Sequence, residues 1–169
     1  MRKVISFEML KNKALSHLER YETSTQRLRI VLLRRIEKDR FQGRPVPPES
    51  HDWVEQIVAK MQELGYVNDT RYAENKTRLW RNSGKGANYI SLHLKLDGID
   101  DEVIYNALHS GEQSNDEIDL NSARKLAKKR HLGEYKSFED RQARYKKEAT
   151  FLTRSGYSFD IVRKVLVGD

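Results

Sequence analysis

The chain has 169 residues, of which 37% are apolar and 34% are charged, and it carries a formal net charge of +7. It contains no cysteine, which excludes disulfides, thiol catalysis and thiolate metal sites. No segment approaches the roughly 20 apolar residues of a membrane span and the first residues lack the apolar core of a signal peptide, so we expect a cytoplasmic protein whose basic surface suits a polyanion or an acidic protein.

Residues 1–67 predict a first unit of three helices. Apolar side chains at helical spacing indicate one helix from about Phe7 to Tyr21. A second helix follows the capping residues at 23–25, and a Pro-rich interruption at 43–49 ends it because proline cannot continue a helix. The third helix is expected from about Ser50 to Leu64.

Residues 68–110 predict a second unit of three helices. A capping Asn or Asp opens a helix that reaches Asn82, and the turn at 83–86 follows it. The alternation from Ile90 to Leu96 is compatible with a strand when it is taken alone. The flanking helical repeats favour a helix that stops at Gly98.

Residues 111–120 are polar and net acidic, and we interpret them as a linker. Residues 121–169 then predict a third unit of three helices, which includes a helix from about Phe138 to Ser155. Gly156 follows that helix as Gly98 follows its own, and it leads into the last helix of the unit.

A short pattern occurs three times, at Ser50–Val58, Asp100–Leu108 and Ser158–Leu166. Each copy opens with a Ser or Asp suited to N-capping and places an acid two residues later, where the helix dipole favours negative charge. Gly65 predicts a left-handed C-terminal cap for the first repeated helix, since glycine lacks a Cβ. The pattern predicts an all-α protein of three tandem three-helix repeats in an elongated, curved array.

Sequence motifs for catalysis are absent. Lys85 stands in a Ser-Gly-Lys-Gly turn without the rest of a P-loop, and the histidines lack the spacing of a metal site. The carboxylates at 100–102 fit helix capping better than general acid–base catalysis. We therefore expect no enzyme, no cofactor, no bound metal and no small-molecule substrate.

Basic residues recur along three predicted helices at helical spacing. Each line is typical either of a surface that meets phosphates or carboxylates or of an ordinary solvated face. Trp53 and Trp80 are expected to be core aromatics rather than stacking platforms. The candidate partner-binding residues are Arg71, Arg78 and Lys85 in one line, Arg27, Arg34 and Lys38 in a second, and Arg124, Lys125, Lys128 and Lys129 in a third.

Three segments resemble the RecX family of recombinase regulators. They are Leu-Gly-Tyr-Val-Asn-Asp-Thr-Arg-Tyr-Ala at 64–73, Gly-Lys-Gly at 84–86, and the run at 94–100 that ends in Gly-Ile-Asp. The resemblance extends over about residues 10–166 and is most specific at 64–73. It implies tandem three-helix repeats and a protein without catalytic activity.

The resemblance also implies a partner. The family binds the RecA recombinase filament on single-stranded DNA and modulates ATP hydrolysis, strand exchange and coprotease activity, usually by inhibition, in DNA recombination, repair and the SOS response. Single-stranded DNA would then be reached through the filament. Two alternatives from other classes stay open: a helix-turn-helix protein that binds duplex DNA, and a helical scaffold for protein partners alone.

Overall fold

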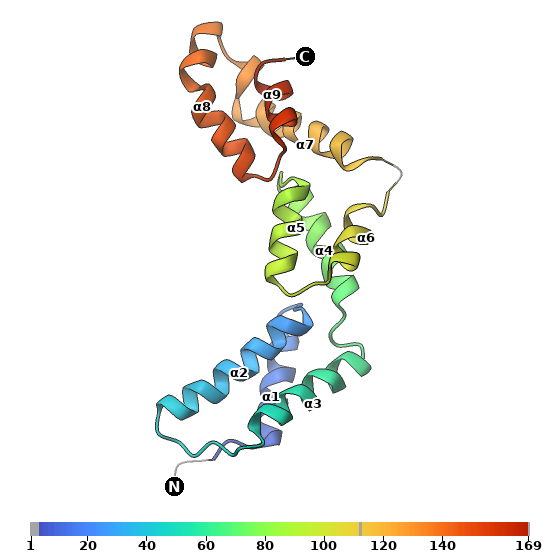
Figure 1. The fold of residues 1–169 in the computed structure, drawn as a ribbon, viewed down its shortest axis with the longest axis vertical. Coiled ribbons are helices and arrows are strands. Elements are labelled where there is room, and N and C mark those ends of the chain that lie inside the picture. The colour runs from blue at the N-terminus through green and yellow to red at the C-terminus, as the bar shows by residue number, and fades with distance from the viewer. Residues whose placement is uncertain (1–3, 112, 169) are drawn as a thin grey trace. The chain divides into compact units, whose positions relative to one another are not determined.

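The computed structural model describes residues 4–111 and 113–168, without the side chains of 138–141. These residues form nine α-helices and one short 3-10 helix, and no strand occurs among them (Figure 1). The predicted all-α class is therefore confirmed, and the run from Ile90 to Leu96 is helical rather than extended. No helix in this part of the chain combines the length and the apolar character that crossing a membrane requires.

The described residues cluster into two compact units. Unit 1 comprises Met1–Tyr72 with Asp97–Ile99, and unit 2 comprises Ala73–Leu96 with Asp100–Asp169. The division falls inside α4 (Asp69–Asn82).

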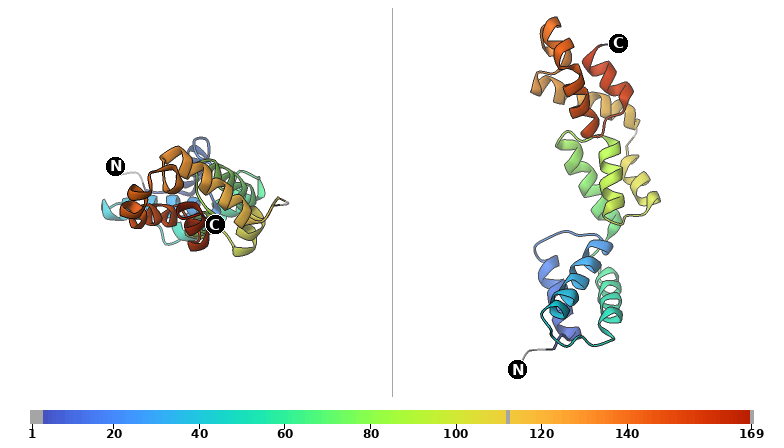
Figure 2. Two further views of the ribbon diagram at one scale, coloured as in Figure 1. Left: turned by 90° about the horizontal axis from the view of Figure 1, so that it is seen from above. Right: turned by 60° about the vertical axis from the view of Figure 1, so that its left-hand side comes forward.

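Unit 1 contains the helices α1 (Phe7–Leu18), α2 (Thr25–Phe41) and α3 (Ser50–Glu63), which all pack against one another (Figure 1 and Figure 2). Their apolar faces meet in one core because apolar residues recur every three or four positions along each helix. The buried core residues are Ile5, Leu10, Ala14, Leu28, Leu32, Ile36, Val54, Ile57, Val58, Met61 and Val67.

Helix capping in unit 1 follows the prediction at one helix and departs from it at another. Ser24 caps α2, since its Oγ accepts a hydrogen bond from the backbone N–H of Arg27 at 3.2 Å. Ser50 was expected to cap α3 but is the first helical residue, and its Oγ donates to the carbonyl of Pro47 at 2.6 Å. The turn that precedes α3 presents this carbonyl to the hydroxyl, so the side chain bonds backward instead of capping.

The three repeated helices differ at their starts. Asp100 precedes α6 (Asp101–Leu108) with extended backbone but makes no side-chain cap hydrogen bond. Ser158 does cap α9 (Phe159–Leu166), because its Oγ accepts from the backbone N–H of Ile161. Gly65 has the left-handed conformation predicted for it after α3, with φ of +73°.

Unit 2 contains most of α4 and six further elements (Figure 1). Three of them enclose one core: α7 (Asn115–Arg130), α8 (Phe138–Arg154) and α9 (Phe159–Leu166). The buried residues of that core are Ala123, Ala127, Leu152, Tyr157, Ile161, Val162, Val165 and Leu166. The elements after α4 are α5 (Ala87–Leu96), α6 (Asp101–Leu108), α7 (Asn115–Arg130), the 3-10 helix η1 (Gly133–Tyr135), α8 (Phe138–Arg154) and α9 (Phe159–Leu166).

The predicted linker at 111–120 is partly wrong, because α7 already begins at Asn115. A capping box starts this helix: Ser114 Oγ accepts from the backbone N–H of Glu117, and the Glu117 carboxylate accepts from the backbone N–H of Ser114. These two reciprocal bonds satisfy orphan donors of the first turn. Polar composition therefore concealed a strong local helix signal.

Both tryptophans are partly buried. Trp53 packs against the core of unit 1, in line with its predicted core position. Trp80 meets the Tyr89 ring edge-on at a centroid distance of 5.8 Å, and the ammonium of Lys76 lies 5.8 Å from the Trp80 ring centroid. The second tryptophan is therefore a helix–helix contact at the edge of α4 rather than a fully enclosed residue.

In unit 1 the segment after α5 closes onto the start of α2. Asp97 is only 2% exposed, and its carboxylate accepts hydrogen bonds from Arg27 Nε at 2.5 Å and from the Tyr72 hydroxyl at 2.7 Å. Ser24 Oγ donates to the Asp97 carbonyl at 2.6 Å. The buried charge thus has both a cationic and a neutral donor, which a buried carboxylate requires.

Gly98 completes this arrangement, which we call the Gly98 contact. Its φ is +77°, and a Cβ at this position would lie 2.4 Å from Gln26 Cβ. The backbone N–H of Thr25, the first residue of α2, donates to Asp69 Oδ1 at 2.8 Å. Only glycine fits both the left-handed conformation and the close approach.

Unit 2 contains an equivalent arrangement, the Gly156 contact. Gly156 has φ of +97°, and a Cβ there would lie 2.4 Å from the backbone nitrogen of Tyr89 on α5. The N–H of Gly86 donates to the Ser155 carbonyl at 2.8 Å, and the N–H of Asn88 donates to the Gly156 carbonyl at 3.3 Å. The two glycines that were matched in sequence therefore lie in the same type of helix-start contact.

Candidate anion-binding interface

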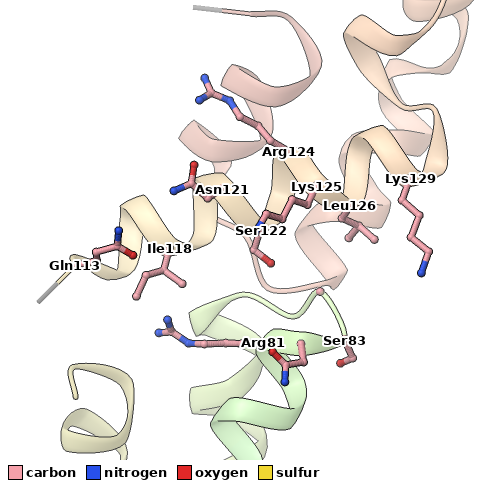
Figure 3. A pocket seen from close by; sticks show the side chains of 12 residues that line it. Arg81, Ser83, Gln113, Ile118, Asn121, Ser122, Arg124, Lys125, Leu126 and Lys129 are labelled. Atoms are coloured by element: carbon pink, nitrogen blue, oxygen red, sulfur yellow. The ribbon is translucent and has the colours of Figure 1, made fainter. Parts of the chain in front are cut away.

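A groove in unit 2 lies between α7 and the turn that ends α4, and it has a volume of about 800 Å³. Figure 3 shows α7 crossing this turn, with Arg81 and Ser83 on one side of the groove and Ser122, Leu126 and Lys129 on the other. We call it the α7 groove. Its lining residues are Arg81, Asn82, Ser83, Gly84, Gln113, Ile118, Asn121, Ser122, Arg124, Lys125, Leu126 and Lys129.

Tertiary contacts hold the turn at 83–86 against α7. The Tyr157 hydroxyl donates to the Gly84 carbonyl at 2.9 Å and lies 3.0 Å from Ser122 Oγ. Burial is the main cause that raises the pKa of Tyr157, so its hydroxyl stays protonated as a donor. A Cβ on Gly84 would lie 3.4 Å from Leu126, which leaves little room between the turn and the helix. One wall of the groove is thus fixed by packing.

Asp119 connects α7 to the start of α5. Its side chain is nearly buried, and Oδ2 accepts from the backbone N–H of Ala87 at 2.8 Å. Burial raises the pKa of Asp119, while the Ala87 hydrogen bond and the Arg81 charge oppose this rise. The carboxylate therefore caps α5 from another helix, at a site where its charge is poorly solvated.

Arg81 fixes one positive charge at the groove. One of its terminal nitrogens donates to the Leu108 carbonyl at 3.2 Å and to Asn115 Oδ1 at 2.5 Å, so it joins the end of α6 to the start of α7. Burial lowers the pKa of Arg81, and the Asp119 charge opposes that effect. Its Nε is buried without a hydrogen-bond partner among the described residues.

The remaining cations of the α7 groove are exposed. Arg124, Lys125 and Lys129 belong to two adjacent turns of α7, and no carboxylate is among the residues that line the groove. The side-chain amides of Gln113 and Asn121 add neutral donors. This combination of cations and neutral donors suits phosphate or carboxylate oxygens.

The third predicted line is therefore the one that contributes most to this groove. Arg124, Lys125 and Lys129 line it, whereas Lys128 is exposed on α7 outside the lining set. The spacing of these residues in sequence explains the difference, because a helix cannot present every cation of a consecutive run on one face.

The second predicted line separates into two parts. Arg27 belongs to the Gly98 contact, where its hydrogen bond to Asp97 is the main cause that raises the Arg27 pKa. Arg34 and Lys38 instead line a different groove, between α1 and α2. Arg27 consequently has a structural partner that the basic line in the sequence did not indicate.

The first predicted line contains residues with intramolecular partners. In unit 1, a terminal nitrogen of Arg71 donates to the carbonyls of Gly65 and Tyr66 at 3.3 and 3.4 Å, and its Nε lies 3.7 Å from the Glu22 carboxylate. In unit 2, Arg78 donates to Asn75 Oδ1 at 2.8 Å. Arg71 therefore helps to close the end of α3.

Lys85 lies outside the α7 groove. Its ammonium is 4.5 Å from the centroid of the Tyr89 ring, which is a favourable cation–π distance. All three members of the first line thus remain predicted partner-binding residues, with their local contacts now defined.

Sequence reasoning missed two sets of basic residues. Arg81 was missed because its position depends on contacts with Leu108 and Asn115 that no local pattern encodes. Cations on α8 line two hollows that Phe151 also lines, and the Arg130 guanidinium of α7 lies 5.4 Å from the centroid of the Phe151 ring. Their helical spacing was a usable signal, and they are Arg144, Lys146, Lys147 and Arg154.

A metal centre has no support in the part of the chain that the structure describes. No group of three or more His, Cys, Asp or Glu side chains there could hold a metal ion.

Comparison with known sequences identifies close relatives. The family model described as "RecX, second three-helix domain" matches residues 68–108. The chain is 34% identical over 164 residues to "Regulatory protein RecX" of Myxococcus xanthus, which covers 96% of this chain and 86% of the relative. It is 36% identical over 107 residues to the protein of the same name from Stenotrophomonas maltophilia, over 63% of this chain and 61% of that relative.

Solved structures agree on the fold. The crystal structure of RecX from Lactobacillus salivarius matches with a TM-score of 0.64 at 23% identity, covering 94% of this chain and 93% of that one. A second structure, of "regulatory protein RecX", matches with a TM-score of 0.61 over 94% of this chain and 72% of the other. The chain belongs to the RecX family of regulatory proteins.

Proposed function

We propose that this chain binds the RecA recombinase filament and inhibits its ATP hydrolysis, strand exchange and coprotease activity. Family membership supports a regulatory role, and the resemblance noted in the sequence supports RecA as the partner. The α7 groove is the structural observation that supports a binding surface for the filament. Its lining contains four cations and no carboxylate; the cations are Arg81, Arg124, Lys125 and Lys129.

The α7 groove would engage the filament through acidic side chains or through phosphates of the single-stranded DNA that the filament carries. Either partner offers oxygen anions to Lys and Arg donors. Both contacts weaken as salt rises, through screening of charge and through release of counterions from DNA. The proposed role needs no catalysis by the chain itself, and it belongs to the cytoplasm.

Duplex DNA is less well supported as the target. The α6 helix begins with exposed Asp101 and Glu102, so a recognition helix of this type would bring carboxylates to the phosphates at the groove. The α9 helix has the exposed acid Asp160 in its first turn. Repulsion at these helix starts opposes insertion into a duplex.

The test is a titration of the full chain against preformed RecA filaments, read out by ATP hydrolysis and strand exchange. We expect the wild-type chain to inhibit both. Lys125→Glu with Lys129→Glu should weaken inhibition by about tenfold or more at low salt, since two groove charges are reversed. Helix content measured by circular dichroism should stay unchanged because both side chains are exposed.

The matched control is Lys60→Glu with Lys164→Glu, which changes net charge equally at exposed positions outside the α7 groove. It should inhibit like the wild type. Arg78→Glu with Lys85→Glu tests the first predicted line in the same assay. Absence of inhibition by the wild type would refute the proposed function, whereas loss only in the Arg78/Lys85 variant would move the contact to α4 and its turn.

A further inference from the structure

A second basic groove lies in unit 1, between α1 and α2, with a volume of about 550 Å³. On each helix, the residues that line the groove are spaced at i, i+3, i+4 and i+7, so they lie on one continuous face of that helix. We call it the α1–α2 groove. Its lining residues are Met9, Asn12, Lys13 and Ser16 from α1, and Val31, Arg34, Arg35 and Lys38 from α2.

The α1–α2 groove is positively charged because the only charged residues in its lining are cations, and two carboxylates of the same helices pair with cations outside it. Glu8 lies 3.7 Å from Lys11, and Glu37 accepts from Arg40 at 2.7 Å. None of these four residues lines the groove. The lining set therefore has four cations and no carboxylate.

One of the four cations is held in place by a buried acid. The side chain of Asp39 is 1% exposed and pairs with Arg35 at 3.2 Å and with Arg44 at 2.7 Å. Because two arginines share one carboxylate, the three side chains together carry a net charge of about +1. Arg35 is thus positioned at the groove by its own structural contact, and an incoming anion meets an ordered guanidinium.

The apolar part of the lining is aliphatic rather than aromatic. Met9 and Val31 are partly buried, and no aromatic side chain belongs to the lining set. Unpaired nucleic acid binds best where aromatic side chains stack on its bases. A thioether and an isopropyl group instead suit aliphatic side chains, and a groove between two helices is a common site for peptide segments.

We propose that the α1–α2 groove binds an acidic peptide segment of a partner protein, with aliphatic side chains placed among its carboxylates. The carboxylates meet Lys13, Arg34 and Lys38, while aliphatic side chains contact Met9 and Val31. Arginine binds a carboxylate through two parallel hydrogen bonds, which fixes the segment in one register. This site lies in unit 1 and goes beyond the proposed function, which rests on the α7 groove.

The test measures fluorescence anisotropy of a short labelled peptide in which Glu alternates with Leu, titrated with the full chain at low salt. Saturable binding is expected. Arg34→Glu with Lys38→Glu on α2 should weaken it by about tenfold or more. Lys13→Glu on α1 should weaken it as well, so the conclusion does not depend on one helix. Circular dichroism verifies that each variant keeps its helix content.

Two controls distinguish binding in the α1–α2 groove from nonspecific electrostatic attraction between the basic chain and the acidic peptide. Lys60→Glu with Lys164→Glu changes the net charge as much as the α2 variant does and should leave binding unchanged. A peptide with Ser in place of every Leu keeps the charge and should bind about tenfold more weakly, because the aliphatic contacts are lost.

Three outcomes would overturn the proposal: no binding of the Glu-Leu peptide, equal losses in the groove and control variants, or an oligothymidine of matched charge that binds more tightly with the same dependence on Arg34 and Lys38. The last result would assign the groove to nucleic acid. No recombinase is present in this assay, so its outcome is independent of the filament titration.

Discussion

The Gly98 contact and the Gly156 contact use the same backbone device with different side-chain chemistry. Each places a left-handed glycine against the start of an earlier helix, α2 in unit 1 and α5 in unit 2. In unit 1 the nearby buried acid, Asp97, has a cationic donor and a hydroxyl donor. In unit 2 Ser155 stands before the glycine instead of an acid, and the buried acid Asp119 accepts from the first N–H of α5 through Oδ2, as Asp69 does at α2. Asp119 Oδ1 has no hydrogen-bond partner among the described residues.

The difference indicates which part of the contact tolerates change. The close backbone approach recurs with glycine both times, because a Cβ would collide in either case. The polar groups around it vary, provided that the orphan N–H donors at the helix start find an acceptor. Backbone geometry therefore defines the contact, and the side chains set its stability and its dependence on pH.

The largest effect is expected for Gly156→Ala. The added Cβ would lie 2.4 Å from the backbone nitrogen of Tyr89, and the left-handed φ of +97° is strained for alanine. We expect a loss of about 4 kcal/mol in the free energy of unfolding of unit 2. Chemical denaturation measures it. Adding Tyr89→Gly should not restore stability, because the collision involves backbone atoms that glycine retains.

Gly98→Ala should destabilise unit 1 by about 3 kcal/mol, and here a second substitution should help. The added Cβ would meet Gln26 Cβ at 2.4 Å, and Gln26→Gly removes that atom. A double-mutant cycle should therefore give a smaller total loss than the sum of the single losses. Strict additivity would show that strain at φ of +77°, rather than the collision, dominates the cost.

Asp97→Ala should cost about 3 kcal/mol, because it leaves the buried Tyr72 hydroxyl and the Arg27 guanidinium without their acceptor. Asp119→Ala should cost only about 1 kcal/mol, the usual value for a lost helix cap. The denaturant midpoints of the two variants, compared with that of the wild type, show which substitution causes the larger loss in the free energy of unfolding. Equal losses would contradict the distinction between the two contacts.

Local signals in the sequence predicted much of this fold. Capping chemistry predicted the roles of Ser24 and Ser158, whose side chains cap α2 and α9. The conformational freedom of glycine predicted the left-handed backbone at Gly65 and Gly98. These features depend on a few neighbouring residues, so they can be read along the chain. The start of α7 was missed although its capping box is local, because the composition of the segment resembled that of a linker.

Contacts between distant residues could not be read in the same way. Arg27 meets Asp97 across a sequence separation of 70 residues, so a basic line on a helix face gave no sign that one member was engaged. The candidate site shows both cases. The spacing on α7 predicted Arg124, Lys125 and Lys129, whereas Arg81 joins them only through tertiary packing.

The smallest effect concerns pH and Asp119, which accepts from the Ala87 N–H at the start of α5, beside the Gly156 contact. Burial raises the pKa of Asp119 above its ordinary value of 3.8, so the folded state binds a proton there more readily than the unfolded state does. Its contribution to stability is fully present below the unfolded pKa and is lost as pH rises through the folded pKa. Asp119→Asn keeps an oxygen for the Ala87 N–H but cannot ionise, so this variant should gain stability relative to the wild type as pH rises from about 3 to about 7. Thermal unfolding across that range measures the difference, with Asp52→Asn on the exposed first turn of α3 as the control. A difference that shrinks with rising pH would mean that the Arg81 charge and the Ala87 hydrogen bond outweigh the effect of burial on Asp119.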